Sequence, residues 1–198
     1  AGALAAYIAL VSGLTVAYCA LVIYPAAAMF GGVSLKSFAR AVLPAQAVAF
    51  SSRSSLVTLP TMLETVRERL GIPEALSSFL FPLAVMVFRC GAAIGQVIGA
   101  LFVAKLYGIA LGTPQFAAIA ATTIVATFSI PGIPGGSIIM MVPVLLAAGL
   151  PAEGVGLLLG VDTIPDMFRT TTNITGNVAA VVILTRNRGA DDGQASTE

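Results

Sequence analysis

The feature that most constrains this chain is the length of its uncharged apolar runs. No charged side chain occurs from Ala1 to Leu35, and none occurs from Leu106 to Ala152. A helix of about 20 apolar residues crosses a bilayer, so both runs are long enough to do so. Only 10% of the 198 residues are charged, against about 25% in soluble domains. The sequence therefore predicts an integral membrane protein, with the lipid bilayer as its main partner.

Composition also argues against several kinds of site. The chain has no His and only Cys19 and Cys90, which lie far apart within apolar runs, so neither a disulfide framework nor metal-ligand spacing is present. The formal net charge is +1, and the sequence has no basic cluster for a phosphate backbone. We expect no cofactor and no nucleic-acid partner.

The first part of the chain divides at its breakers and charges. Residues 1–35 predict a transmembrane helix that ends at Gly31 and Gly32. Within 36–106, two short apolar stretches flank the polar centre 51–55, and neither can cross alone. We therefore expect a re-entrant hairpin over 38–63, a charged connector over 64–69, and one long helix over 75–106 that is interrupted by Arg89. Gly91, Gly95 and Gly99 on that helix favour close helix packing.

Residues 107–185 repeat this pattern, with a hairpin over 113–150, a breaker at 131–137, and a last helix over 154–185. Residues 186–198 predict a polar, disordered tail. The expected fold is an all-α membrane protein. It is an inverted repeat of two re-entrant helical hairpins, each followed by a transmembrane helix, with one transmembrane helix before them.

Charge placement predicts the orientation. Three crossings put Lys105 on one side of the membrane and the other basic residues near helix ends on the opposite side; these are Lys36, Arg40, Arg67, Arg69, Arg186 and Arg188. By the positive-inside rule, the basic side is cytoplasmic. We expect a multi-pass protein of the cell membrane with a cytoplasmic C-terminus and a substrate site near the midplane.

The last helix carries nearly all of the intramembrane polarity on one face. Five polar side chains fall within roughly 80° of one another at helical spacing, and Thr170 extends the stripe; they are Asp162, Asp166, Arg169, Asn173 and Asn177. Ionised groups at membrane depth imply a partner, a ligand or water beside them. The alternative is that Asp166 and Arg169 only neutralise each other and join helices. Pro165 predicts a kink that frees a carbonyl one turn earlier.

The two hairpin tips are candidate ligand contacts. Ser54 and Ser55 can offer hydroxyl and helix-terminal N–H groups to an anion. Gly132, Gly135 and Gly136 allow close approach of the backbone to a ligand. Either tip can equally be an ordinary loop, but their pairing within a repeated unit favours a site.

Three stretches resemble the dicarboxylate/amino acid:cation symporter family, which transports glutamate, aspartate and four-carbon dicarboxylates. They are Arg53–Pro60, Gly132–Gly136 and Asp162–Gly176. The resemblance implies that Arg169 binds the distal carboxylate of the substrate, that Asp166 meets its amino group, and that Thr170 and Asn173 hold the other end. The hairpin backbones at Ser55 and Ile133 would close over the ligand, the second as the extracellular gate.

The resemblance also implies an elevator-like transporter and no enzyme activity. In this family an N-terminal scaffold forms trimers, and this chain corresponds to most of the C-terminal transport domain. The predicted substrate-binding residues are Arg53, Ser54, Ser55, Arg89, Ile133, Pro134, Gly135, Asp162, Asp166, Arg169, Thr170 and Asn173.

Two departures from the family pattern concern the coupling ion. The family motif Asn-Met-Asp-Gly-Thr is replaced by residues 88–92, which read Phe-Arg-Cys-Gly-Ala, and Asn177 stands where sodium-coupled members carry aspartate. We hypothesise that the Arg89 guanidinium replaces a sodium ion, so that transport is proton-linked or needs no cation. Alternatively, Arg89 pairs with an acidic group for folding. A further alternative is that a residual cation site is retained near Asp162, Asn173 and Asn177.

Two other functions compete with a transporter. An anion channel would use the same polar stripe as a permanent pore. An intramembrane enzyme would use Asp162 and Asp166 as paired carboxylates, but two groups one turn apart on one helix cannot flank a substrate bond from both sides. We therefore expect a secondary transporter for acidic amino acids or small dicarboxylates such as aspartate, glutamate, fumarate or succinate.

Overall fold

The computed structural model describes residues 2–186, and all secondary structure within that range is helical. This confirms the predicted all-α class. The predicted tail, apart from Arg186, lies outside the described residues. The helices, in chain order, are α1 Gly2–Tyr18, η1 Cys19–Ile23, α2 Tyr24–Gly31, α3 Leu35–Ser52, α4 Ser55–Leu70, α5 Glu74–Val87, α6 Cys90–Leu106, α7 Thr113–Thr127, α8 Gly136–Ile139, α9 Val142–Ala147, α10 Gly154–Val161 and α11 Thr163–Thr185.

The first three elements form one continuous helix of 30 residues, which we call the first helix. Its middle turn, η1, is π-helical. Pro25 explains this turn, because a proline cannot donate to the carbonyl four residues earlier and its ring crowds that carbonyl. The helix ends at Gly32, whose φ of 70° is left-handed. Many of its large apolar side chains point outward, as expected for a helix against lipid.

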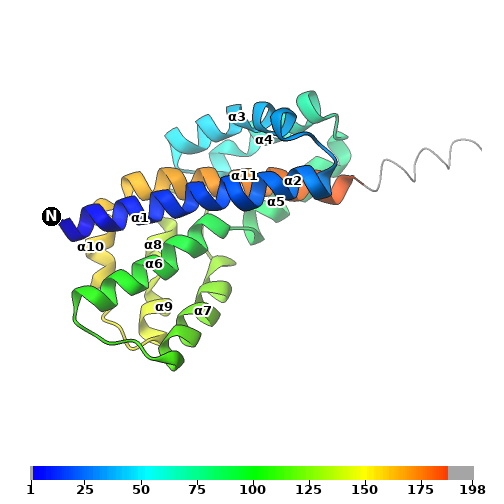
Figure 1. Ribbon diagram of the computed structural model, residues 1–198. Helices are drawn as coiled ribbons and strands as arrows, with labels where there is room; N and C mark the ends of the chain where they lie inside the picture. Colours follow the sequence, from blue (N-terminus) through cyan, green and yellow to red (C-terminus); the bar gives the residue numbers. More distant parts are fainter. Residues whose placement is uncertain (1, 187–198) are drawn as a thin grey trace, which may run out of the picture.

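The chain then turns back on itself in α3 and α4, which pack side by side (Figure 1). We call residues 35–70 the first hairpin. Its turn is only two residues long: Arg53 adopts φ 54°, and the Ser54 hydroxyl accepts from the Val57 N–H to cap α4.

The prediction of a connector at 64–69 was wrong, because α4 continues to Leu70 and ends at left-handed Gly71. The charges in this stretch indicate an exposed helical face. Glu and Arg favour helix, and only Gly71 provides a stop.

The predicted interruption at Arg89 is confirmed. Helix α5 ends at Val87, Phe88 and Arg89 are not helical, and α6 begins at Cys90. Together α5 and α6 cover 33 residues that are long and apolar enough to cross a membrane. The glycine face of α6 packs against α11, since a Cβ on Gly91 would overlap the Arg169 carbonyl and one on Gly95 would overlap the Arg169 side chain.

The second turn-back is less regular. Helix α7 ends at Thr127, residues 128–135 form turns, and the chain returns through two short helices, α8 and α9. We call residues 113–147 the second hairpin. The last predicted helix is divided into α10 and α11 at Asp162. This interruption lies one turn before Pro165, as the missing N–H of proline predicts.

Helix α11 is the centre of the molecule. It contacts α1, α2, α3, α4, α5 and α6, and most of its residues are buried. The first hairpin lies on one side of it and the second hairpin on the other (Figure 1). Two apolar cores result, one around α3, α4 and the end of α11, the other around α6, α9 and α10. The stripe of α11 lies where the two hairpin tips meet.

Candidate functional site

The polar stripe of α11 is buried along its whole length. Asp162, Asp166, Arg169, Thr170, Asn173 and Asn177 are each no more than 5% exposed. In lipid or in protein, such groups are retained only where they are paired or hydrogen-bonded. The contacts of each side chain therefore indicate its role.

Arg169 forms a buried ion triplet with two carboxylates. Its Nη2 lies 2.7 Å from Asp162 Oδ2 and 3.1 Å from Asp166 Oδ1. Its Nε and Nη1 have no hydrogen-bond partner among residues 2–186. Arg169 thus pairs with both carboxylates through one nitrogen and keeps N–H donors for another acceptor. Arg169 and the two carboxylates therefore neutralise one another in part, but two nitrogens of the guanidinium are left without a hydrogen-bond acceptor.

The two asparagines of the stripe hold the broken helix. Asn173 Oδ1 accepts from the N–H groups of Gly91 and Ala92 at the start of α6, at 2.8 and 3.3 Å. The amide nitrogen of Asn177, in the orientation that suits its neighbours, lies 2.9 Å from the Phe88 carbonyl and 3.1 Å from the Ala84 carbonyl. Helix α11 therefore satisfies the free N–H groups at the start of α6 and the Phe88 carbonyl, and it gives the Ala84 carbonyl, which already accepts from the Phe88 N–H, a second donor.

The hairpin tips touch each other directly. The Ser54 hydroxyl donates to the Gly132 carbonyl at 2.7 Å. The Gly135 N–H donates to Asp166 Oδ2 at 3.1 Å, so the second tip is also attached to the ion triplet. A Cβ on Gly132 would come within 2.7 Å of the Leu56 side chain, which shows how closely the tips approach.

A cavity of about 20 Å³ lies between the tips and α11. This is room for about one water molecule. Of the predicted substrate residues, it is lined by Arg53, Ser55, Arg89, Ile133, Asp166, Arg169, Thr170 and Asn173. Ser54, Gly135 and Asp162 contact this set through the bonds described above, whereas Pro134 is exposed and does not line the cavity. Residues from four separate segments are thus brought together as the sequence predicts.

Arg89 is the least compensated charge in this cavity. Its side chain is 7% exposed, its Nε has no hydrogen-bond partner, and no carboxylate oxygen lies within 4 Å of it in the described part of the chain. Arg53 is more exposed and donates to the Thr163 hydroxyl at 3.5 Å. Three guanidinium groups therefore stand against two carboxylates around the cavity, leaving one positive charge uncompensated.

Sequence reasoning missed two residues behind the site. Tyr7 of α1 is 2% exposed and lies near Arg169 and Asp162, and its hydroxyl has no hydrogen-bond partner among the described residues. Gln96 of α6 donates to the Ser137 carbonyl at 3.1 Å and so holds the second hairpin just after its tip. A Tyr or Gln in an apolar helix is a weak signal, because its partners lie on distant segments.

Comparison with known proteins agrees with this geometry. The model of the sodium:dicarboxylate symporter family matches residues 1–187. The chain belongs to this family. The resemblance carried by the hairpin tips and the last helix is confirmed at that level, and the chain is an integral membrane protein of a transporter family.

Relatives of this symporter-family chain include transporters with different substrates in their names. The proton/sodium-glutamate symport protein of Bacillus subtilis is 32% identical over 89% of this chain and 41% of the relative. The proton/glutamate-aspartate symporter of Escherichia coli is 34% identical over 84% and 38%. Human neutral amino acid transporter A is 34% identical over 70% and 26%. The chain thus spans well under half the length of these relatives.

Proposed function

We propose that this chain forms the substrate-binding part of a secondary transporter for acidic amino acids or small dicarboxylates. The observation that carries the proposal is the surplus of buried guanidinium N–H groups around the cavity. Arg169 Nε and Nη1 and Arg89 Nε have no acceptor among the described residues. A buried unsatisfied charged donor costs free energy, and a carboxylate is the acceptor whose geometry matches a guanidinium.

The substrate class follows from the charges. With one uncompensated positive charge at the site, an acidic amino acid of charge −1 makes the site neutral. Asp166 would bind the amino group of this substrate. The Oδ2 atom of Asp166 already accepts a hydrogen bond from the Gly135 N–H. A plain dicarboxylate leaves that bond intact and places its second carboxylate near Arg89 or Arg53. Aspartate, glutamate, fumarate and succinate all belong to the proposed class.

Loading the site requires movement of a tip. A cavity of about 20 Å³ is too small for a four-carbon diacid. The second tip is the better candidate for the moving part, because residues 128–135 are not helical. Its position depends on hydrogen bonds of Gly132, Gly135 and Ser137 to other segments, which can break without unfolding a helix. The proposal retains the inverted repeat of two re-entrant hairpins, the elevator motion and the cytoplasmic C-terminus. A cavity of only about 20 Å³ does not favour a permanently open anion channel.

Sodium coupling is proposed to be weakened or replaced. Sodium is a hard cation that binds oxygen ligands, as calcium and magnesium do. Here the carbonyls of Ala84 and Phe88 accept from the Asn177 amide, and Arg89 carries a fixed positive charge beside them in the chain. Nitrogen donors thus take up oxygens that a cation would need. The absence of an acidic partner within 4 Å of Arg89, within residues 2–186, argues against a folding ion pair.

Substrate binding by Arg169 can be tested by calorimetry on the full-length protein. Arg169→Ala should reduce affinity for aspartate and succinate by roughly 100-fold or more, because charge-assisted hydrogen bonds contribute about 1.5–3 kcal/mol each. Arg169→Lys keeps a charge beside Asp162 and Asp166 but loses the planar fork, so it controls for misfolding. Wild-type affinity for both acids in a folded Arg169→Lys variant would contradict the proposed role.

The coupling hypothesis needs a flux measurement. Uptake of labelled aspartate or fumarate into liposomes should be nearly the same with and without a sodium gradient. Unlabelled substrate inside should accelerate uptake by exchange, which a channel would not show. Strong dependence on sodium would overturn the role assigned to Arg89 and Asn177.

A further inference from the structure

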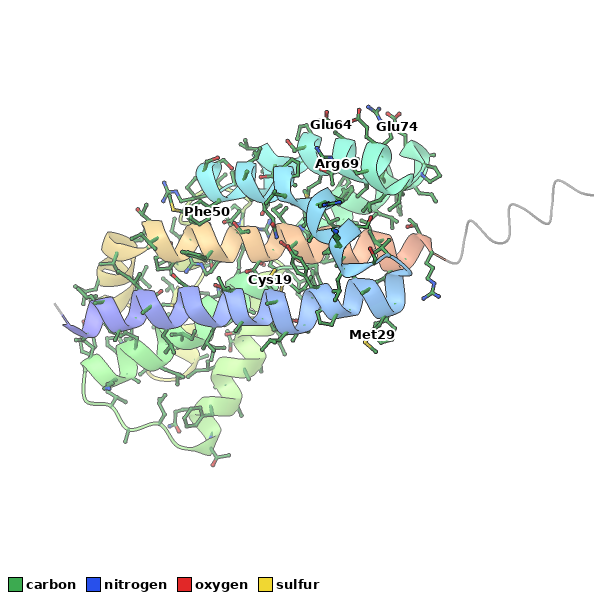
Figure 2. All side chains as sticks on the ribbon, turned by 45° about the horizontal axis from the view of Figure 1, so that its top comes forward. Cys19, Met29, Phe50, Glu64, Arg69 and Glu74 are labelled. Carbon is green, nitrogen blue, oxygen red and sulfur yellow. The ribbon has the colours of Figure 1, made fainter. Side chains whose placement is uncertain are left out.

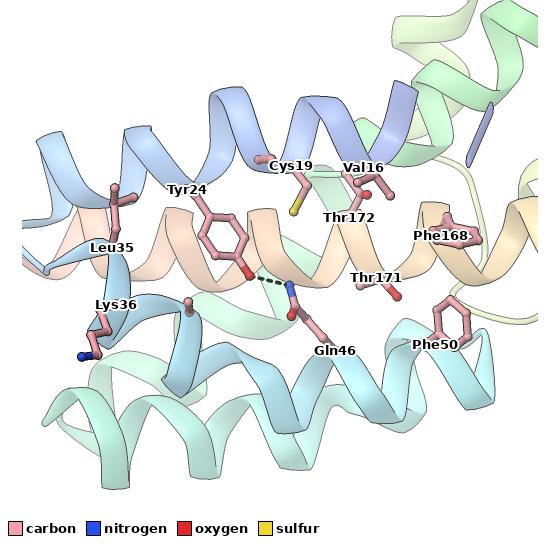
Figure 3. A pocket seen from close by; sticks show the side chains of 12 residues that line it. Val16, Cys19, Tyr24, Leu35, Lys36, Gln46, Phe50, Phe168, Thr171 and Thr172 are labelled. Carbon is pink, nitrogen blue, oxygen red and sulfur yellow. Dashed lines mark hydrogen bonds between the residues drawn. The ribbon is translucent and has the colours of Figure 1, made fainter. Parts of the chain in front are cut away.

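Two cavities that border α11 differ in how their polar side chains are paired. A cavity of about 610 Å³ lies between the first helix, α3 and α11 (Figure 3). Gln46 donates there to the Tyr24 hydroxyl at 3.0 Å (Figure 3), and it also donates to the Thr175 hydroxyl at 2.8 Å. No buried side-chain nitrogen or oxygen that lines this cavity lacks a partner within residues 2–186. The buried polar groups of this cavity are therefore satisfied within the protein.

The small cavity between the hairpin tips is different, because a hydroxyl beside it has no partner. Ser137, the second residue of α8, lines this cavity and is 6% exposed. Its Oγ is buried and forms no hydrogen bond among the described residues. A buried hydroxyl without a partner costs free energy. The predicted substrate residues do not include Ser137, and nothing in the proposed function uses its hydroxyl.

Ser137 is the only polar side chain that the second hairpin brings to the cavity. The structure describes all of residues 113–147, and this hairpin also lines the cavity with Ile130, Pro131, Gly132 and Ile133. Ser129 is exposed and does not line the cavity. A side-chain hydrogen bond between the second hairpin and a ligand in this cavity must therefore come from Ser137.

The backbone at Ser137 is held without use of the hydroxyl. Gln96 of α6 is fully buried, and its Nε2 donates to the Ser137 carbonyl at 3.1 Å. The preceding residue, Gly136, lies against the tip, since a Cβ there would come within 2.8 Å of the Pro131 carbonyl. These contacts place Ser137 beside the cavity and leave its Oγ available to a ligand.

We propose that the Ser137 hydroxyl donates a hydrogen bond to a carboxylate of the bound substrate, and that this bond links closure of the second tip to loading of the site. The inference rests on the proposed function and adds a side chain of the moving tip to it. A ligand shifts a conformational equilibrium only through an interaction that differs between the two states. In the closed, empty site the hydroxyl is unpaired. A substrate carboxylate removes that cost, so loading favours the closed tip.

The neighbouring groups favour a carboxylate as the acceptor. Arg89 and Arg169 line the same cavity and also have N–H groups without a partner in the described part of the chain. A hydrogen bond to a charged acceptor is stronger than one to a neutral acceptor. Asp166, the group proposed to bind an amino group, is itself an acceptor. Ser137 thus belongs with the donors that surround the acidic part of the substrate.

Calorimetry on the full-length protein with aspartate and succinate tests the bond. Ser137→Ala should reduce the affinity for both acids about tenfold, because hydrogen bonds to charged groups are strong. Ser137→Cys keeps a similar volume but offers only a weak donor, so it should lose nearly as much affinity. Ser129→Ala is the matched control, because it removes an exposed hydroxyl of the same tip outside the cavity. This control should bind both acids as the wild type does.

Amide hydrogen exchange of the substrate-free protein tests the link to closure. Removing an unpaired buried hydroxyl stabilises the closed, empty state, so Ser137→Ala should slow exchange over 128–135 while it weakens substrate binding. A residue that only supports the fold would change both properties in the same direction.

Unchanged or faster exchange in Ser137→Ala would overturn the proposal. So would wild-type affinity in either variant of Ser137, or a loss of affinity for aspartate alone, because that loss would assign the hydroxyl to the amino group. A wild-type protein that binds neither acid would overturn the proposed function itself, and this inference with it.

Discussion

The two hairpins of this protein differ in how their tips are formed and held in place. The first is built from two long helices, α3 and α4, joined by a two-residue turn in which Ser54 caps the returning helix. The second has an eight-residue non-helical tip over 128–135 and returns through the short helices α8 and α9. Its tip depends on hydrogen bonds to other segments, at Ser54, Asp166 and Gln96. The first tip thus holds itself by its own helix cap, whereas the second is held by other segments, and this difference supports the proposal that the second tip is the one that moves.

Figure 2 shows a further contrast in charge. Glu64, Arg69 and Glu74 project from the far end of the first hairpin and the start of α5 (Figure 2). The second hairpin carries no charged residue between Thr113 and Ala147. In the membrane arrangement that we propose, these charges would keep the base of the first hairpin at the membrane surface, because charged side chains are costly at depth. The second hairpin would have no such restraint.

Among tests of the difference between the two hairpins, the largest expected effect comes from forcing the tips apart. Gly132→Val places a side chain where Leu56 already lies, and overpacking costs about 1–3 kcal/mol. Because Leu56 is 54% exposed and belongs to the first hairpin, Leu56→Ala should restore the space. We expect substrate affinity to fall at least tenfold in the single variant and to recover in the double variant. A single variant that binds normally would show that the tips need not meet.

A smaller effect should follow from Ser54→Ala. This change removes the cap of α4, worth about 1 kcal/mol, and the bond to Gly132, worth about another 1 kcal/mol. Amide hydrogen exchange should rise over 128–135 while α3 stays protected. Ser51→Ala is the control, because the Ser51 hydroxyl donates only within α3, to the carbonyls of Ala47 and Val48. Equal exchange in both variants would mean that the second tip is not held by the first.

The smallest pair of effects compares two left-handed glycines. Gly135 of the second tip has φ 74°, and Gly71 at the end of the first hairpin has φ 67°. Alanine at either costs about 1–2 kcal/mol in backbone strain. Both variants should lose thermal stability to a similar extent, but only Gly135→Ala should weaken substrate binding, since its N–H holds Asp166. Calorimetry on both variants separates strain at the site from strain elsewhere.

The breaks in the helices were predictable because local chemistry fixes them. Pro165 predicts a kink, which the structure shows as the interruption at Asp162; the small residues around Gly91 predict close helix packing, and the structure shows that α11 is the partner. The burial of the stripe followed from its helical spacing. These features depend on residues near one another in sequence, where backbone geometry decides the outcome.

Features that depend on tertiary contacts were not predictable. The stretch 64–69 was predicted to be a connector because its charged side chains follow an apolar run. Only the fold shows that these side chains lie on the exposed face of α4. The roles of Tyr7 and Gln96, and the bond between Ser54 and Gly132, join segments far apart in the chain. The sequence identified which groups are polar, but only the fold determined which of them keep unsatisfied donors.

The attachment of Asn177 to the carbonyls of Ala84 and Phe88 has a consequence for descent within the family. If nitrogen donors at two positions have replaced a coupling ion, neither replacement can be reversed alone. Restoring aspartate at 177 would leave the Arg89 charge in place, and removing Arg89 would leave the carbonyl oxygens engaged by the amide. A lineage that regained sodium coupling would need both substitutions. A protein with only one of them would be poorly suited both to sodium-coupled transport and to transport without sodium.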